Sequence, residues 1–132
     1  MKTIKKTAHN WREFDLAINF LSKKLSKNKQ IKNIYAIPRG GLPLAVSLSH
    51  RLNLPIIMNE TEISPQTLVV DDIFDSGKTI ANLASRKSFS ICAFWFKNIK
   101  TEPPENLKIF YYKTKKNNDW VVFPWETPKT TF

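Results

Sequence analysis

Three aspartates followed by a small-residue turn are the residues of this chain best suited to bind a polar ligand. The segment from Thr67 to Thr79 runs from apolar and β-branched residues into Asp71, Asp72 and Asp75. The whole chain has five aspartates, so more than half of them fall within a window of five residues. A strand that leads through such a turn into a helix presents free backbone N–H groups, which favour an anion such as phosphate.

The turn and the aspartates are suited to bind different chemical groups of a ligand. The run Ser76-Gly77-Lys78-Thr79 offers backbone N–H groups and two hydroxyls, which suit a phosphate. Asp71 and Asp72 would repel a phosphate, so the vicinal hydroxyls of a ribose or a hydrated divalent cation suit them better. The spacing is not that of a Walker loop. A simple helix N-cap would explain one acidic residue, but not three beside a glycine.

Glycine is scarce in this sequence, and its placement is therefore informative. The three glycines all lie in two candidate ligand loops, Arg39-Gly40-Gly41 and Ser76-Gly77-Lys78. Glycine allows positive φ angles and a close approach of the backbone to a ligand. Both loops are thus candidates for binding phosphorylated groups.

Composition limits the classes of protein that need to be considered. A length of 132 residues fits one domain, residues 1–132, and 42% hydrophobic content is that of an ordinary soluble globular chain. We expect a cytoplasmic protein without membrane contact, because no apolar stretch reaches spanning length and the N-terminus lacks a signal-peptide core. The net charge of +10 comes from scattered lysines, with only four arginines, so nucleic acid is not the favoured partner. The single cysteine, Cys92, lies in an apolar run and is expected to be a buried thiol.

Helical and strand periodicities alternate along the chain, which predicts an α/β fold. Apolar residues at three- and four-residue steps predict a helix from Trp11 to Leu25. Further helices are expected over 42–52 and 79–87, and strands over 34–37, 55–58, 68–70, 90–96, 107–112 and in 120–126. Continuous apolar strands separated by helices are typical of a mainly parallel central sheet flanked by helices. In such a sheet ligands bind beyond the carboxyl ends of the strands, where both glycine loops lie.

Three segments together resemble a known family. The run Val69–Thr79 resembles the phosphoribosyl-pyrophosphate (PRPP) signature of type I phosphoribosyltransferases, and Arg39-Gly40-Gly41 is similar to that family's pyrophosphate loop. Residues 120–126 resemble the purine-recognition end of its xanthine-guanine and hypoxanthine branch. The resemblance covers nearly the whole chain. It implies transfer of 5-phosphoribosyl from PRPP to a 6-oxopurine (guanine, xanthine or hypoxanthine) in purine salvage, giving a nucleoside monophosphate and pyrophosphate.

The resemblance implies one set of roles toward PRPP. Asp71 and Asp72 would hold the ribose hydroxyls, and Asp72 would also lie close to the Mg²⁺ cofactor. The run Asp75-Ser76-Gly77-Lys78-Thr79 would bind the 5-phosphate, although Lys78 stands where the family commonly has a small residue. Arg39 and Gly40 would hold the departing pyrophosphate.

A second set of implied roles concerns the purine. Asp75 matches the general acid/base that faces N7. Lys97 matches the lysine that donates to the 6-oxo group, which would favour oxopurines over adenine. Trp120 would stack on the base, and Val121 would read its edge through backbone atoms. Glu126 matches an acidic position near either the base or the metal.

One departure from the family concerns the lid of the site. Residues 59–66 are shorter than the mobile flap that usually closes over PRPP, so the site should be more open. Two alternatives to purine transfer follow: a PRPP- or nucleotide-binding regulator that contacts nucleic acid, and a phosphoribosyltransferase for a different base. The resemblance also implies a homo-oligomer, either a dimer or a tetramer.

Overall fold

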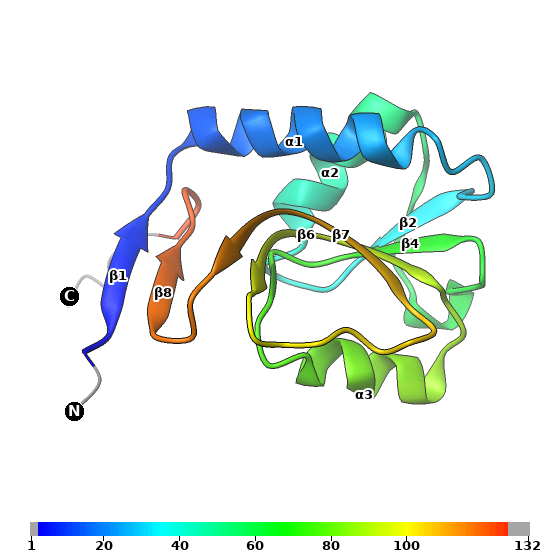
Figure 1. Ribbon diagram of the computed structural model, residues 1–132. Helices are drawn as coiled ribbons and strands as arrows, with labels where there is room; N and C mark the ends of the chain where they lie inside the picture. Colours follow the sequence, from blue (N-terminus) through cyan, green and yellow to red (C-terminus); the bar gives the residue numbers. More distant parts are fainter. Residues whose placement is uncertain (1–2, 127–132) are drawn as a thin grey trace, which may run out of the picture.

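The computed structural model describes residues 3–126, in which a central sheet is flanked by helices on both faces (Figure 1). The elements are β1 (Lys5–Ala8), α1 (Trp11–Leu25), β2 (Asn33–Ala36), α2 (Leu42–Leu52), β3 (Ile56–Ile57), the 3₁₀ turn η1 (Glu60–Glu62), β4 (Thr67–Val70), β5 (Ile73–Phe74), α3 (Lys78–Arg86), β6 (Ile91–Asn98), β7 (Lys108–Lys115) and β8 (Asp119–Val122). The central sheet has the order β3-β2-β4-β6-β5, with β7 also paired to β6. Every strand pairing in the described part of the chain is parallel, which confirms the predicted fold class.

Each face of the sheet has its own hydrophobic core. Helices α1 and α2 cover one face and α3 covers the other (Figure 1). Helix α1 contributes the predicted stripe of Phe14, Ile18, Leu21 and Leu25, all buried, and Asn10 caps it by accepting a hydrogen bond from the Glu13 amide at 2.9 Å. Trp11, the first residue of the predicted stripe, is instead 52% exposed, although its ring packs against Phe14.

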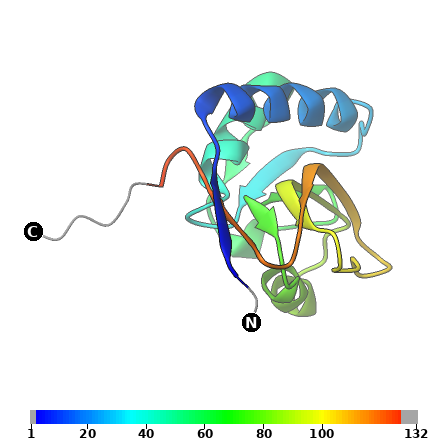
Figure 2. The same cartoon turned by 60° about the vertical axis from the view of Figure 1, so that its left-hand side comes forward.

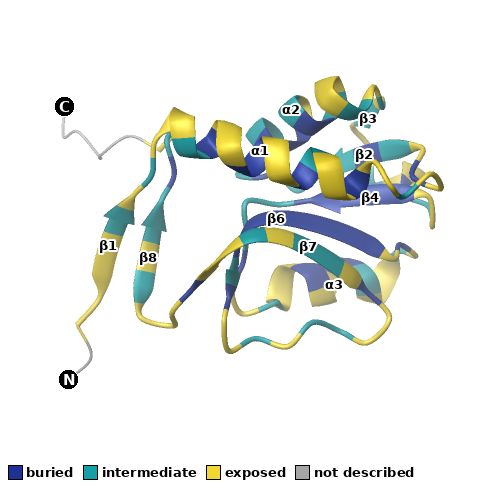
Figure 3. Ribbon diagram, turned by 45° about the horizontal axis from the view of Figure 1, so that its top comes forward, coloured by how far each residue is buried: buried dark blue, intermediate teal, exposed yellow. Residues whose placement is uncertain are grey.

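Burial decreases from the centre of the sheet to its edges (Figure 3). All four residues of β4 are buried, as expected for a strand covered on both faces. In β6, Cys92 is fully buried, and burial raises the pKa of its thiol to about 12. The prediction of a buried thiol at this position is thus confirmed.

A separate two-stranded sheet joins the two ends of the described chain. Strand β1 runs parallel to β8, with Lys6 opposite Trp120 (Figures 1 and 2). The sequence analysis did not predict β1, because its polar residues show no strand periodicity, nor β5, which has only two residues. This small sheet holds the segment 119–126 at the edge of the main sheet. No helix within residues 3–126 is both long enough and apolar enough to cross a membrane.

Candidate active site

The predicted ligand loops meet at one edge of the sheet, beyond the carboxyl ends of β2 and β4. The first loop follows β2 and contains Arg39, Gly40 and Gly41; the peptide bond between Pro38 and Arg39 is cis. A Cβ atom on Gly40 would lie 2.2 Å from Oδ2 of Asp72, so the carboxylate lies directly against this backbone. Arg39 is exposed in the turn beside it.

Gly41 explains why the two loops come so close. A Cβ atom there would lie 2.4 Å from the carbonyl oxygen of Val70, the last residue of β4. The Gly41 amide also donates a hydrogen bond to the Ile37 carbonyl at 2.9 Å. Only glycine fits between these two strand ends, and the loops are packed together as a result.

Asp71 and Asp72 place two adjacent carboxyl groups at this edge. Burial, followed by the charge of Asp72, raises the pKa of Asp71 to about 8. Burial also raises the pKa of Asp72, and the charge of Glu126 adds to this effect. The amide of Asp72 donates to Oδ1 of Asp71 at 2.8 Å. Carboxylates held together in this way favour a cation or hydroxyl donors as ligands.

The acidic residues fit Mg²⁺ in combination with a substrate. Within residues 3–126 no group of three acidic, histidine or cysteine side chains is arranged to hold a metal ion by itself. Mg²⁺ is commonly held by one or two carboxylates together with substrate phosphates and water, so it does not need such a group. Asp72, whose carboxylate lies at this edge against the Gly40 backbone, offers oxygen atoms suited to such a role.

The small-residue turn has the geometry of a phosphate site. Gly77 is the N-cap of α3 with φ of 81°, and the Lys78 amide donates to the Ser76 hydroxyl at 3.3 Å. Unpaired N–H groups at the start of a helix attract an anion. A hollow of about 240 Å³ lies here, lined by residues 71–77 together with Thr79 and Ile80. Lys78 begins the helix and is exposed, and it does not line this hollow.

A second cavity, of about 190 Å³, lies next to the first. It is lined by Asp72, Ile73, Asp75, Lys115, Asp119, Trp120, Val121, Phe123 and Glu126. Trp120 is 58% exposed, and its ring is free to cover a flat ligand. Glu126 accepts a hydrogen bond from the Phe123 amide at 2.8 Å, which holds the turn after β8. The cavity therefore gathers four of the predicted purine-site residues: Asp75, Trp120, Val121 and Glu126.

Lys97 does not line this cavity. Its ammonium donates to the Asn98 carbonyl oxygen at 3.0 Å and lies 5.7 Å from the centre of the Tyr111 ring. The cause lies in β6, where Trp95 and Phe96 both pack into the same core cluster and both amides donate to the Asp72 carbonyl. Side-chain alternation is interrupted there, and Asn98 rather than Lys97 reaches Asp75.

Two residues near Asp75 were missed by the sequence analysis. Asn98 donates to Oδ1 of Asp75 at 2.9 Å, and the Lys115 ammonium lies 3.1 Å from the same oxygen. The sequence analysis counted Lys115 among the scattered lysines that give the chain its net charge. The signal available in the sequence was its place at the end of an apolar strand, two residues beyond Lys113.

The segment between β3 and β4 is a short ordered turn. Asn59 caps η1 by accepting a hydrogen bond from the Thr61 amide at 3.0 Å, and Glu60 forms an ion pair with Arg86 of α3 at 2.5 Å. Ile63 is buried against the core beneath α3. The segment is thus packed against α3 and the core beneath it.

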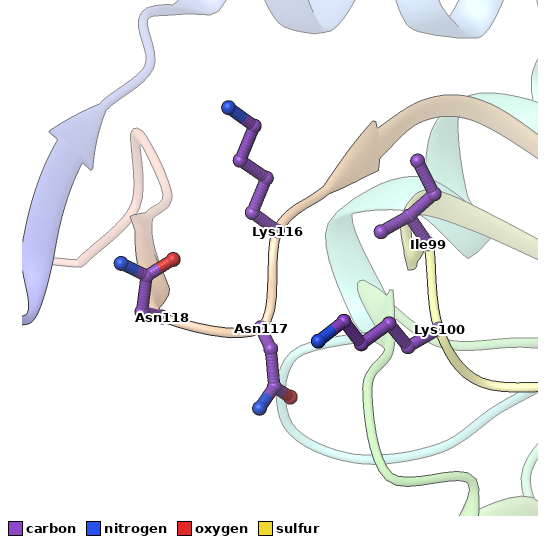
Figure 4. Close-up of a pocket in the computed structure, with 5 residues that line it drawn as sticks. All are labelled: Ile99, Lys100, Lys116, Asn117 and Asn118. Atoms are coloured by element: carbon purple, nitrogen blue, oxygen red, sulfur yellow. The ribbon is translucent and has the colours of Figure 1, made fainter. Parts of the chain in front are cut away.

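A further hollow of about 280 Å³ lies beside the site, lined by Ile99, Lys100, Lys116, Asn117 and Asn118. Lys100 points toward Asn117 across it, whereas Lys116 points away (Figure 4). All five lining residues are exposed, and none of the predicted site residues is among them. The candidate active site is therefore the pair of hollows that share Asp72 and Asp75.

The mainly parallel sheet flanked by helices, with the two ligand loops at its edge, is that of the type I phosphoribosyltransferase fold. A purine phosphoribosyltransferase of Pyrococcus horikoshii Ot3 matches the structure with a TM-score of 0.78 and 25% identity, covering 98% of this chain and 99% of that one. A protein of Neisseria gonorrhoeae with bound ppGpp matches with a TM-score of 0.76 and 20% identity, covering 96% and 92% of the two chains.

The sequence itself is similar to purine phosphoribosyltransferases. The xanthine-guanine phosphoribosyltransferase of Idiomarina loihiensis is 26% identical over 89% of this chain and 84% of its own length. No protein-family model matches the sequence. The relatives of this chain are thus purine phosphoribosyltransferases, enzymes of the pentosyltransferase class.

Proposed function

We propose that this protein transfers the 5-phosphoribosyl group of PRPP to a 6-oxopurine, giving a nucleoside monophosphate and pyrophosphate. The observation that carries the proposal is that the phosphate hollow and the Trp120 cavity share Asp72, Ile73 and Asp75 as lining residues. A ribose placed over this shared wall has its 5-phosphate on the α3 side and its anomeric carbon on the Trp120 side. The two hollows match the two ends of a nucleotide.

Different residues bind the 5-phosphate, the ribose and the pyrophosphate of PRPP. The 5-phosphate binds the turn Ser76-Gly77-Lys78-Thr79, and the ribose hydroxyls bind Asp71 and Asp72. Arg39 and the backbone of Gly40 hold the pyrophosphate. Asp72 would also hold Mg²⁺, which when bound neutralises charge on the leaving pyrophosphate.

The reaction requires opposite charges to be stabilised at the two ends of the breaking bond. As the bond from the anomeric carbon to pyrophosphate breaks, positive charge develops on the ribose and negative charge on the leaving group. The carboxylates of Asp71 and Asp72 face the ribose, while Arg39 faces the pyrophosphate. The purine stacks on Trp120, with Val121 and Glu126 at its edge, and its ring proton passes to Asp75 as the new bond forms.

The preference for a 6-oxopurine rests on the sequence resemblance and on the xanthine-guanine relative. Lys97, the donor expected for the 6-oxo group, lies beside Tyr111 outside the cavity. The choice among guanine, xanthine and hypoxanthine therefore depends on the other cavity residues. Assembly into a dimer or tetramer stays a prediction of the resemblance.

The test is turnover of PRPP and Mg²⁺ with guanine, hypoxanthine, xanthine and adenine. We expect transfer to at least one 6-oxopurine and a loss of at least about 100-fold in kcat for Asp75→Asn, the usual cost of removing a general base. Asp15→Asn, on the exposed face of α1, is the matched control and should keep wild-type rates. Absence of transfer to every purine would refute the proposal.

A nucleotide-binding regulator is the second candidate, and the fold neighbour with bound ppGpp favours it. The packed turn at residues 59–66 is consistent with this role, because a site without a mobile lid binds a ligand more readily than it shields a reaction from water. Calorimetry with PRPP, guanosine monophosphate and ppGpp separates the two candidates. Tight nucleotide binding without base turnover, together with salt-dependent binding of nucleic acid, would favour the regulator.

A further inference from the structure

Lys115 is the one buried charged residue in the described part of the chain. It is 7% exposed. The other buried polar residues among those described, Thr67 and Asn98, are uncharged. A buried ammonium group costs free energy unless an anion and hydrogen bonds compensate it. The compensating anion here is Asp75, whose side chain is itself half exposed to the cavity.

The two carboxylate oxygens of Asp75 have different surroundings. Oδ1 accepts hydrogen bonds from the Lys115 ammonium at 3.1 Å and from the Asn98 amide at 2.9 Å. Within residues 3–126 no donor to Oδ2 is found. One oxygen is thus held by two protein donors, and the other is left to the cavity that contains Trp120.

A neighbouring hydrogen bond orients Asn98, and strand pairing places Lys115 beside it. Oδ1 of Asn98 accepts from the Lys100 amide at 3.0 Å, so its amide nitrogen must face Asp75. In the β6–β7 pairing Asn98 lies opposite Lys115, which brings the two side chains to the same place from adjacent strands. The Thr101 hydroxyl donates to the Asp75 carbonyl at 2.5 Å and holds the backbone of Asp75 as well.

We propose that Lys115 is a positioning residue, which with Asn98 holds Oδ1 of Asp75 so that Oδ2 is presented as the base. The inference rests on the proposed function. When a ring nitrogen of the purine attacks the anomeric carbon, the carbon–oxygen bond to pyrophosphate breaks and its electron pair leaves with the pyrophosphate. The proton lost from the imidazole ring of the purine then goes to Oδ2 of Asp75.

The charges around Asp75 explain why a cation is needed there. The carboxylates of Asp72, Asp119 and Glu126 line the same cavity, and Asp71 lies in the adjoining hollow. Lys115 is the one basic residue among the residues that line these two hollows. Without it, Asp75 would share these two hollows with four other carboxyl groups and with no cation among the lining residues. The Lys115 ammonium, 3.1 Å from Oδ1, is thus the positive charge that the lining supplies to Asp75.

The experiment compares kcat/KM between pH 5 and pH 9 for wild type, Lys115→Met, Lys115→Arg and Asn98→Ala. We expect Lys115→Met to lose about 10- to 100-fold at neutral pH and to move the acidic limb of the profile to higher pH by about one unit. Lys115→Arg should restore the acidic limb, because it keeps the charge. Lys113→Met, an exposed lysine on the same strand, is the matched control and should behave as wild type.

A double-mutant cycle shows whether Lys115 acts by positioning Asp75 or by contacting the purine directly. Because Lys115 acts through Asp75, Lys115→Met should cost less than about threefold in an Asp75→Asn background. An equal loss in both backgrounds, or an unchanged pH profile in Lys115→Met, overturns the inference while the proposed function stands. If the wild-type protein transfers ribose phosphate to no purine, both the proposed function and the role of Lys115 are refuted. Should Lys115→Met not fold by circular dichroism, Lys115→Gln replaces it in the same cycle.

Discussion

Gly40 and Asp72, which are 32 positions apart in the sequence, lie against one another at the edge of the sheet. A Cβ atom on Gly40 would come within 2.2 Å of Oδ2 and 2.6 Å of Cγ of Asp72. The loop proposed to hold pyrophosphate and the carboxylate proposed to hold the ribose and the metal therefore share one packed contact. A side chain at position 40 would therefore have to displace the Asp72 carboxylate.

The first prediction is that Gly40→Ala displaces the carboxylate of Asp72. The added methyl group should cost about 1–3 kcal/mol of stability, as overpacking does, and should weaken PRPP binding at least about tenfold. Urea denaturation and calorimetry measure the two effects. The double variant Gly40→Ala with Asp72→Ala should recover stability but not PRPP binding, because it removes the clash together with the ligand group. Unchanged stability and affinity in Gly40→Ala would contradict this contact.

The second prediction concerns the pH dependence of stability at Asp71. Its pKa of about 8 in the folded protein is above its ordinary value of 3.8, so the folded state binds the proton more tightly. The stability that this provides is complete below the ordinary value and is lost as the pH rises toward 8. Asp71→Asn should therefore gain stability relative to wild type between pH 4 and pH 8, by at most about 1.4 kcal/mol per pH unit, and level off above.

Denaturation of both proteins at several pH values measures this difference. Asp15→Asn, which removes an exposed carboxylate from α1, serves as the control and should show no such trend. A difference between Asp71→Asn and wild type that does not change with pH would show that Asp71 is ionised throughout.

The third prediction concerns the turn that replaces the flap. Residues 59–66 are held by the Asn59 cap, the Glu60–Arg86 ion pair and the buried side chain of Ile63. We expect hydrogen exchange in this segment to be unchanged by PRPP and Mg²⁺, while residues 71–79 gain protection. Strong protection of residues 59–66 on PRPP binding would show instead that the turn moves over the site.

The fourth prediction assigns Trp120 to the base. Because its ring is 58% exposed, Trp120→Ala should leave the melting temperature nearly unchanged. Loss of base stacking, worth about 1–3 kcal/mol, should raise KM for the purine about 10- to 100-fold with little change in KM for PRPP. Trp120→Phe should retain most of the affinity. Initial-rate kinetics with each substrate varied in turn measures both constants, and equal losses for the two substrates would point to a structural role.

The fifth prediction separates the two lysines at the ends of β6 and β7. Lys97 packs beside Tyr111 and is not among the residues that line the cavity, so Lys97→Met should change kcat/KM by less than about threefold. Comparing guanine or hypoxanthine with adenine also tests its expected part in selecting oxopurines. A large fall in the preference of Lys97→Met for oxopurines over adenine would show that Lys97 does contact the purine.

The sequence alone determined the features that depend on neighbours along the chain. The 3.6-residue pattern predicted helices α1, α2 and α3, because burial of one helix face imposes that period. The continuous apolar runs predicted the central strands, because those strands are covered on both faces. The acidic run at Asp71 and the glycine loops were recognisable for the same reason, since a phosphate turn is made from consecutive backbone groups.

Only the tertiary structure decided which distant side chains meet. Interrupted alternation at Trp95 and Phe96 turned Asn98 toward Asp75 and Lys97 away, a change that no local pattern encodes. Lys115 contacts Asp75, 40 positions away in the sequence, because β6 pairs with β7. Residues 5–8 form a strand because they pair with β8. The aspartate turn was thus readable from its own residues, but the groups that hold Asp75 depend on strand register, which the whole packed sheet sets.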